Sequence, residues 1–162
     1  MAEIPTPETV TLIRVPRALV RASADALRRM SSTGVESVVL WQGSVVDPDV
    51  AVVRELVIPR QVAGPLHFNV PLEERLRLID VVSAKGEIIL AQLHTHPRAA
   101  FHSPVDDRLA IPQHVGGISI VIADFARTWT GDLEVTSVNR HLGAAVWEEL
   151  TPYAVSRLFG FT

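Results

Sequence analysis

An apolar run that ends abruptly in two histidines constrains this chain more than any other feature. The run covers residues 87–93 (EIILAQL) and continues as His94-Thr95-His96-Pro97. Its length and composition predict a buried β-strand. Side chains alternate between the two faces of a strand, so a strand that continues through the motif places His94 and His96 on one face and Thr95 on the other. Because the polar end of a buried strand needs partners, we expect a site at this point.

The segment that follows the histidines adds a carboxylate. Residues 103–106 read Ser-Pro-Val-Asp, and Ser at N-cap, Pro at N1 and an acid at N3 predict a helix start close to a capping box. Such a start would fix the direction of Asp106. Two imidazoles and one carboxylate give three protein ligands for Zn²⁺, with a fourth position open to water, as in catalytic zinc sites. Asp107 is the alternative carboxylate. A purely structural zinc usually has four protein ligands, so a catalytic site is favoured.

The remaining sequence predicts an α/β fold. Valine-rich runs are typical of strands, and apolar residues at helical spacing are typical of amphipathic helices. The turn Asp47-Pro48-Asp49 predicts a hairpin. We therefore expect a single domain over residues 1–162, a mixed β-sheet flanked by helices, with residues 1–8 as a loose lead-in. The predicted strands are 10–15, 35–43, 50–59, 87–96, 118–122, 134–140 and 144–150, and the predicted helices are 16–34, 71–86 with Leu72, Leu76, Ile79 and Val82 inward, a short one from 104, and 151–159.

The composition excludes several classes of function. Of the 162 residues, 48% are hydrophobic and 20% are charged, which is typical of a soluble globular protein. The net charge of −3 gives no general attraction to nucleic acid or to an anionic membrane, and we expect neither as a partner. The chain has no cysteine, which excludes disulfides, thiolate ligands and cysteine-protease chemistry and fits a cytoplasmic location. We expect no signal peptide and no membrane span.

The motif as a whole resembles a known family. The run His94-Thr95-His96-Pro97, followed by Ser103-x-x-Asp106, is similar to the signature of the JAB/MPN (JAMM) metalloproteases, and the resemblance spans residues 35–125. The signature also needs a glutamate on an earlier strand, a few residues before a glycine that ends that strand. Glu36, seven residues before Gly43, fits this description better than Glu55, which can pair with Arg54. Six residues separate His96 from Ser103, one fewer than in the best-known eukaryotic members.

The resemblance implies a cytidine-deaminase-like MPN/JAB fold, a cofactor and a reaction. His94, His96 and Asp106 would hold Zn²⁺, Glu36 would act as the general base, and Ser103 would donate a hydrogen bond to the oxyanion. The substrate would be the bond at the C-terminus of a ubiquitin-like protein, or of its conjugate, whose tail enters as an extended strand beside the sheet. The absence of long insertions matches compact bacterial members, which could act in a ubiquitin-like conjugation or antiphage operon.

Other readings remain open at this point. A metallopeptidase that processes a sulfur-carrier protein would share the same metal site. A non-catalytic MPN-type scaffold would typically lack one or more ligands, and all of them are present here. Of the other histidines, His102 lies beside Ser103 and could contact substrate, whereas His67, His114 and His141 are expected to be surface or satisfied polar residues.

Overall fold

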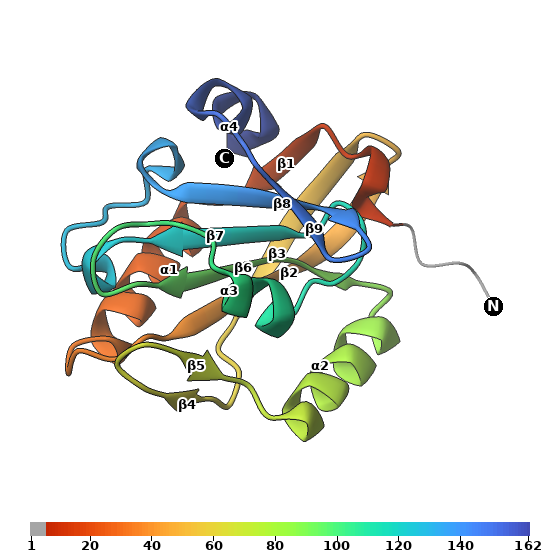
Figure 1. Ribbon diagram of the computed structural model, residues 1–162. Helices are drawn as coiled ribbons and strands as arrows, with labels where there is room; N and C mark the ends of the chain where they lie inside the picture. The colour runs from red at the N-terminus through yellow and green to blue at the C-terminus, as the bar shows by residue number, and fades with distance from the viewer. Residues whose placement is uncertain (1–5) are drawn as a thin grey trace.

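The computed structural model describes residues 6–162 (Figure 1). The predicted lead-in falls partly outside this range, because residues 1–5 are not described. Its remaining part is ordered: Pro7–Thr9 forms a short 3-10 helix, η1, with proline at its first position. Arg140 holds this segment against the fold, since its guanidinium donates to the carbonyls of Pro7 and Val10 at 3.1 and 2.7 Å.

A mixed eight-stranded sheet forms the centre of the fold, in the order β10-β1-β3-β2-β6-β7-β8-β9. β6 lies near its middle, antiparallel to β2 and parallel to β7. β4 and β5 pair separately as a two-stranded sheet. The strands are β1 (Leu12–Val15), β2 (Val38–Asp47), β3 (Val50–Val57), β4 (Val62–Ala63), β5 (Phe68–Asn69), β6 (Ile88–Thr95), β7 (Ile118–Ile122), β8 (Ser137–Gly143), β9 (Val146–Glu149) and β10 (Phe159–Phe161).

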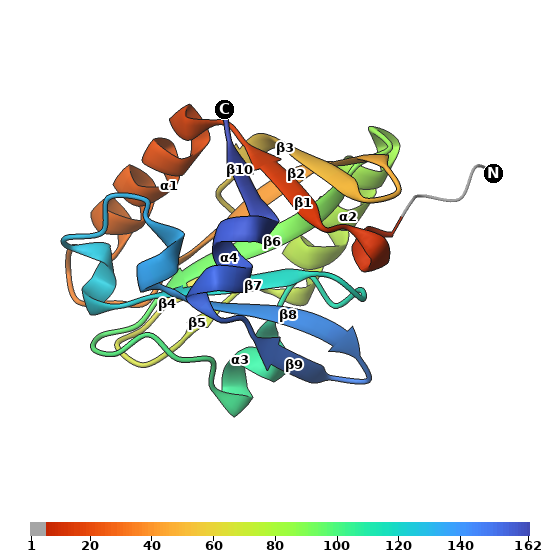
Figure 2. The same ribbon diagram turned by 90° about the horizontal axis from the view of Figure 1, so that it is seen from above.

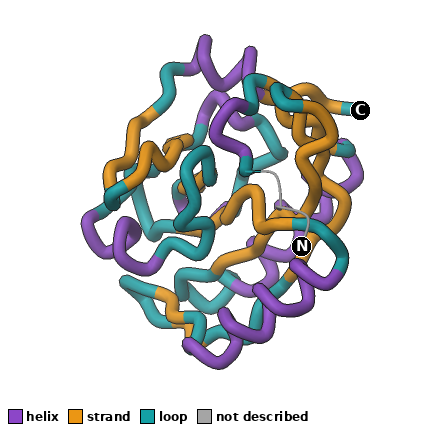
Figure 3. Tube along the Cα trace, turned by 90° about the vertical axis from the view of Figure 1, so that its right-hand side faces the viewer, coloured by secondary structure: helices purple, strands orange, loops and turns teal. Residues whose placement is uncertain are grey.

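Helices cover both faces of the sheet. Apolar side chains of α1 and α4 pack in one buried cluster, and those of α2 pack in a second cluster against Val38, Leu40 and Ile89. Figure 2 places α1 and α3 on opposite sides of the sheet, and Figure 3 shows the helices around the strands. None of the helices in residues 6–162 combines the length and apolar character of a membrane span. The helices are α1 (Arg17–Met30), α2 (Leu72–Ala84), α3 (Pro104–Leu109) and α4 (Pro152–Leu158), with 3-10 turns η2 (Asp124–Ala126) and η3 (Leu133–Val135).

The predicted fold class is confirmed, and most of the predicted elements are present. The strand at 118–122 has the predicted bounds, and the turn at residues 47–49 joins β2 and β3 as an antiparallel hairpin. Thr151 caps α4, accepting a hydrogen bond from the Ala154 amide at 3.2 Å. The C-terminal helix is shorter than predicted, because residues 159–161 leave it and pair with β1 as a parallel edge strand.

The inward face predicted for α2 is confirmed at Val82 and wrong at the other three positions. Leu72, Leu76 and Ile79 are 71%, 53% and 54% exposed, whereas Leu78 and Val82 are buried. Glu74 explains the rotation, because its buried carboxylate accepts hydrogen bonds from the Arg60 amide at 3.0 Å and from the Arg77 guanidinium at 2.8 Å. These bonds fix Glu74 inward, and residues four and eight positions later then face the sheet.

The glycine expected to end the second strand does not end it. β2 continues past Gly43 to Asp47, with a register shift between Gln42 and Gly43. A Cβ atom at residue 43 would lie only 1.9 Å from the Val52 carbonyl oxygen. Gly43 is therefore required by the close approach of β3 at an irregular point of the ladder, not by a turn.

Candidate metal centre

The end of β6 presents two histidines on one face. His94 pairs with Val38 of β2 on one side and with Val121 of β7 on the other, so its backbone is held from both directions. His94 is fully buried, and His96 is 5% exposed. Thr95 points to the opposite face, where its hydroxyl lies 2.9 Å from the Ser31 hydroxyl and accepts from the Ser37 amide at 3.0 Å. The alternation predicted from the sequence therefore holds.

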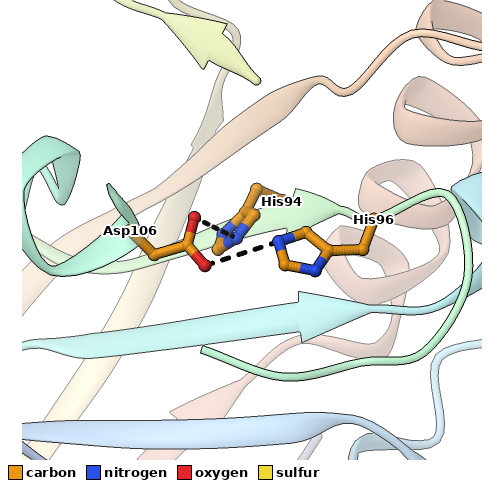
Figure 4. Close-up of side chains that lie close together, drawn as sticks. All are labelled: His94, His96 and Asp106. Carbon is orange, nitrogen blue, oxygen red and sulfur yellow. Dashed lines mark ion pairs between the residues drawn. The ribbon is translucent and has the colours of Figure 1, made fainter. Parts of the chain in front are cut away.

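The start of α3 brings Asp106 to these histidines. Ser103 and Asp106 form the predicted capping box: the Ser103 amide donates to Asp106 Oδ2 at 2.7 Å, and the Asp106 amide donates to Ser103 Oγ at 3.1 Å. Figure 4 shows the carboxylate facing both rings, with Oδ1 at 3.2 Å from His94 Nε2 and Oδ2 at 3.4 Å from His96 Nε2. The loop with one residue fewer thus still places the carboxylate beside both imidazoles.

The donor set of this cluster fits a divalent metal. One ligand atom from each of His94, His96 and Asp106 lies within 4.8 Å of the others. Burial lowers the pKa of His94, which keeps its imidazole neutral and able to offer a lone pair. Burial opposes ionisation of Asp106, but its contacts with His94 and then His96 outweigh this and hold its pKa well below the usual range. Within residues 6–162, both buried ring nitrogens of His94 lack a hydrogen bond of acceptable geometry, and a metal bound at Nε2 would give that nitrogen a partner.

The structure places the alternative carboxylates elsewhere. Asp107 turns away from the cluster, and its Oδ1 lies 2.8 Å from His102 Nδ1. Glu55 is half exposed on β3 and pairs with Lys85 at 3.1 Å. Arg54, the partner that the sequence suggested for Glu55, lies 3.7 Å from Glu87 instead. Neither Asp107 nor Glu55 belongs to the cluster.

Glu36 lies beside the cluster, although it is not on a strand. β2 begins at Val38, whose pairing with His94 sets a register that, continued backwards, puts Glu36 opposite His96. The Glu36 amide donates to the Gly64 carbonyl at 2.8 Å instead of to β6. Burial, only partly offset by His96 and reinforced by Asp106, raises the pKa of Glu36 to about 7. A carboxyl with this pKa can accept and release a proton near neutral pH.

A cavity of about 590 Å³ opens at these residues. The polar groups in its wall include Glu36, His96, Ser103 and Asp106. Most other lining residues are apolar, and three segments far apart in the sequence supply them: the β4–β5 turn, the loop before α3 with α3 itself, and η2. These apolar members are Pro65, Leu66, Phe68, Pro97, Ala99, Phe101, Val105, Leu109 and Phe125.

Two segments that line this cavity, the β4–β5 turn and η2, were not predicted from the sequence. Gly64-Pro65 is a turn signal that could have indicated the β4–β5 hairpin, whose His67 also lines the cavity. Phe125 gave no signal, because it lies in a left-handed turn of three residues other than glycine, Asp124 to Ala126, with φ of 49°, 50° and 58°. The Phe125 amide donates to the His96 carbonyl at 2.9 Å, which fixes this turn to the end of β6.

The remaining histidines have structural surroundings. His114 Nε2 lies 2.8 Å from the Ile89 carbonyl oxygen, and His141 Nδ1 lies 3.1 Å from the His114 carbonyl oxygen. The suggestion that His102 contacts substrate is wrong for this geometry. His102 does not line the cavity, and its ring packs against Trp147 of β9 at a centroid distance of 4.9 Å.

Comparison with known proteins agrees with this site. A probable metalloprotease of Sinorhizobium fredii is 32% identical over 159 residues, covering 96% of this chain and 97% of the relative. The solution structure of a protein from Desulfitobacterium hafniense shares the fold, with a TM-score of 0.65 and 18% identity over 93% of both chains. A JAB1/MPN domain protein from Archaeoglobus fulgidus aligns with a TM-score of 0.49 and 19% identity, over 85% of this chain and 94% of that one. No family model matches the chain.

The fold and the cluster at its centre are those of a metal-dependent peptidase. The chain belongs to the same metalloprotease family as the relative that spans nearly its whole length. Its motif, His94-Thr95-His96-Pro97 with Ser103-x-x-Asp106, resembles the JAB/MPN signature. The His94, His96 and Asp106 cluster is the possible metal site of this family member.

Proposed function

We propose that this protein is a zinc-dependent isopeptidase or peptidase that cleaves the bond at the C-terminus of a ubiquitin-like protein in the cytoplasm. The observation that carries the proposal is the single cavity that joins the His94, His96 and Asp106 cluster to Glu36 and Ser103. A general base, an oxyanion donor and a set of metal ligands in one wall are the parts that metal-assisted hydrolysis of an amide requires.

His94, His96 and Asp106 would hold the metal, and the residues around them would handle the protons. A metal such as Zn²⁺ held by these residues would supply Lewis acidity and would lower the pKa of water to about 7. Glu36 takes the proton of the attacking water and later delivers it to the leaving amine. The pKa of Glu36, about 7 without a metal, would be lowered by a bound cation, which favours the ionised form that accepts the proton.

Ser103 is free to stabilise the oxyanion even though it caps α3. Its Oγ accepts the Asp106 amide at 3.1 Å, and a hydroxyl that accepts one bond still has its own hydrogen to donate. The same capping box therefore orients a metal ligand and a hydrogen-bond donor together.

The shape of the cavity supports an extended peptide as substrate. The β4–β5 turn forms one wall, and the loop before α3 forms another, so a flexible tail can enter between them. Phe68 of β5 lines the cavity, so a tail could extend beside this strand, and the main chain of β5 could contribute affinity through hydrogen bonds. The exposed apolar residues Leu66 and Phe101 at this opening favour contact with a protein over a small polar metabolite.

The test compares wild type with Glu36→Gln. Metal content is measured by mass spectrometry of the native protein, and cleavage is measured on a ubiquitin-like protein extended at its C-terminus and on a matched sulfur-carrier fusion. We expect about one zinc per chain in both proteins, and a fall in kcat of roughly 10²–10⁴-fold in Glu36→Gln. Glu55→Gln, on the neighbouring strand and paired with Lys85, is the matched control and should keep full activity.

Each other outcome removes a defined part of the proposal. Equal activity in Glu36→Gln removes Glu36 as the base. If the wild-type protein binds no metal, metal-assisted hydrolysis is excluded and a non-catalytic scaffold becomes the favoured interpretation. Cleavage of the sulfur-carrier fusion alone replaces the proposed substrate with the other one.

A further inference from the structure

Three polar contacts cross the start of α3, and the capping box accounts for two of them. Counting from the N-cap Ser103, His102 is N′, Asp106 is N3 and Asp107 is N4. Many helices join N′ to N4 by an apolar contact, the hydrophobic staple, which fixes the angle at which the chain enters the helix. Here the same two positions are joined by an imidazole and a carboxylate, His102 Nδ1 to Asp107 Oδ1 at 2.8 Å.

The imidazole of this polar staple is buried against the edge of the sheet. The His102 side chain is only 6% exposed, and its ring packs on Trp147 at 4.9 Å between centroids. Trp147 in turn packs on His141 of β8 at 4.8 Å. Phe101, one residue before His102, points the other way and packs edge-on to the ring of His96 at 4.8 Å. The end of the loop is thus held on one side by the metal centre and on the other by β9.

Stability alone does not explain these residue types. Within residues 6–162, His102 Nε2, His141 Nε2 and Trp147 Nε1 are all buried without a hydrogen-bond partner. A buried polar atom without a partner is destabilising, and an ordinary apolar staple would avoid that cost. A hydrogen bond is directional, whereas an apolar contact is not. The His102–Asp107 bond therefore restricts the carboxylate of Asp107, and with it the first turn of α3, to one orientation.

We propose that His102 is a positioning residue for the metal centre, held by Asp107 and Trp147, and that the β9 edge thereby sets where Asp106 and Ser103 stand. α3 has six residues, too few to be stable by itself, so its place depends on contacts such as these. The inference rests on the proposed function only in that Asp106 is taken as a metal ligand.

The test measures metal binding, which needs no substrate. The affinity for Zn²⁺ is obtained by competition with a chromogenic chelator, and the visible absorption of the Co²⁺-loaded protein reports the ligand geometry. His102→Ala should weaken Zn²⁺ binding by roughly 10–100-fold, as loss of a residue that supports a ligand typically does, and should alter the Co²⁺ spectrum. Asp107→Asn keeps an acceptor for Nδ1–H and should bind Zn²⁺ almost as wild type does, whereas Asp107→Ala should resemble His102→Ala.

Trp147 provides a second, independent variant on an exposed edge strand, where folding is less at risk. Trp147→Ala should weaken Zn²⁺ binding, and Trp147→Phe, which keeps a ring for His102, should largely restore it. Val146→Ala is the matched control, since Val146 is 53% exposed on the same strand. If both residues act through one contact, the His102→Ala/Trp147→Ala double variant binds no more weakly than His102→Ala alone.

Two results would overturn the inference without touching the proposed function: wild-type affinity and Co²⁺ spectrum in both His102→Ala and Trp147→Ala, or fully additive losses in the double variant. Failure of wild type to bind any metal overturns the proposed function itself.

Discussion

The two halves of the metal centre are held in place by different kinds of structure. His94 stands on β6 and His96 directly follows it; β6 has hydrogen-bonded neighbours on both sides and is buried along almost its whole length. Ser103 and Asp106 stand on a helix of six residues that follows an irregular loop. In the first half the sheet register fixes the ligands. In the second half, side-chain hydrogen bonds do so.

This difference predicts which substitutions the site tolerates. A ladder of main-chain bonds is insensitive to most side-chain substitutions, so the strand half should fail only when a ligand itself is removed. The helix half depends on individual side chains, and each of them has a measurable share in the geometry. Both expectations can be tested, beginning with the largest effect.

Removal of a ligand from the strand half should abolish the metal site. His94→Ala takes away a ligand that no neighbouring side chain can replace, so Zn²⁺ affinity should fall by more than the roughly 100-fold that loss of a supporting residue costs. Chelator competition on the purified protein measures this. Thr95→Val is the adjacent control on the opposite face. It leaves the buried Ser37 amide without its acceptor, while the Ser31 and Ser37 hydroxyls still bond each other, so it should lower the free energy of unfolding by about 1–3 kcal/mol and leave Zn²⁺ affinity unchanged.

Removal of the hydroxyl from the helix half should affect two properties at once. Ser103→Ala loses the oxyanion donor and the N-cap, so kcat should fall roughly 10²–10³-fold and the free energy of unfolding by about 1 kcal/mol. Steady-state kinetics and urea unfolding measure the two effects. Ser103→Thr keeps a hydroxyl for both purposes and should restore both. A loss of stability with unchanged kcat would show that Ser103 only caps α3.

Glu36, which lies beside the strand half, has a buried carboxyl, and the free-energy cost of burying it depends on pH. The pKa of Glu36 in the folded protein, about 7, exceeds its ordinary value of 4.5. The folded state therefore holds this proton more tightly than the unfolded state, and stability is lost as pH rises from about 4.5 to 7. In metal-free protein, Glu36→Gln should be more stable than wild type by about 1–3 kcal/mol at pH 8 and no more stable at pH 4.

Urea unfolding in the presence of a chelator measures this difference. Glu55→Gln, which changes an exposed carboxylate on β3, should show no such trend with pH. A difference between Glu36→Gln and wild type that stays constant between pH 4 and pH 8 would mean that the burial of Glu36 carries no linked proton.

Local patterns were sufficient to predict much of the centre. The alternation along residues 88–95 predicted the common face of His94 and His96, and the Ser-Pro-x-Asp spacing predicted the capped start of α3. Both depend on backbone geometry over a few residues, which sequence spacing reports directly.

Features that depend on distant contacts could not be predicted in the same way. The spacing of leucines in α2 favoured a stripe that faces solvent, because nothing local shows that Glu74 is held inward by the Arg60 amide. The place of Glu36 also depends on a distant residue: its amide bonds to Gly64 of the hairpin, and β2 begins at Val38, three residues later than the valine-rich pattern indicates. Likewise, the packing of His102 on Trp147 joins residues 45 positions apart.

The alternation of side chains along β6, with His94 and His96 on one face and Thr95 on the other, has a consequence for where such chains can gain or lose residues. Deletion of one residue from β6 would exchange its faces, burying the histidines among apolar side chains and turning Thr95 towards Asp106. Deletion of a residue from the loop after Pro97 changes only the path of the chain to α3. The loop here is already one residue shorter than in the best-known eukaryotic members, and it still brings Asp106 to the histidines. Relatives with this chemistry are therefore expected to differ in length between Pro97 and His102 and to keep the residue count of the strand unchanged.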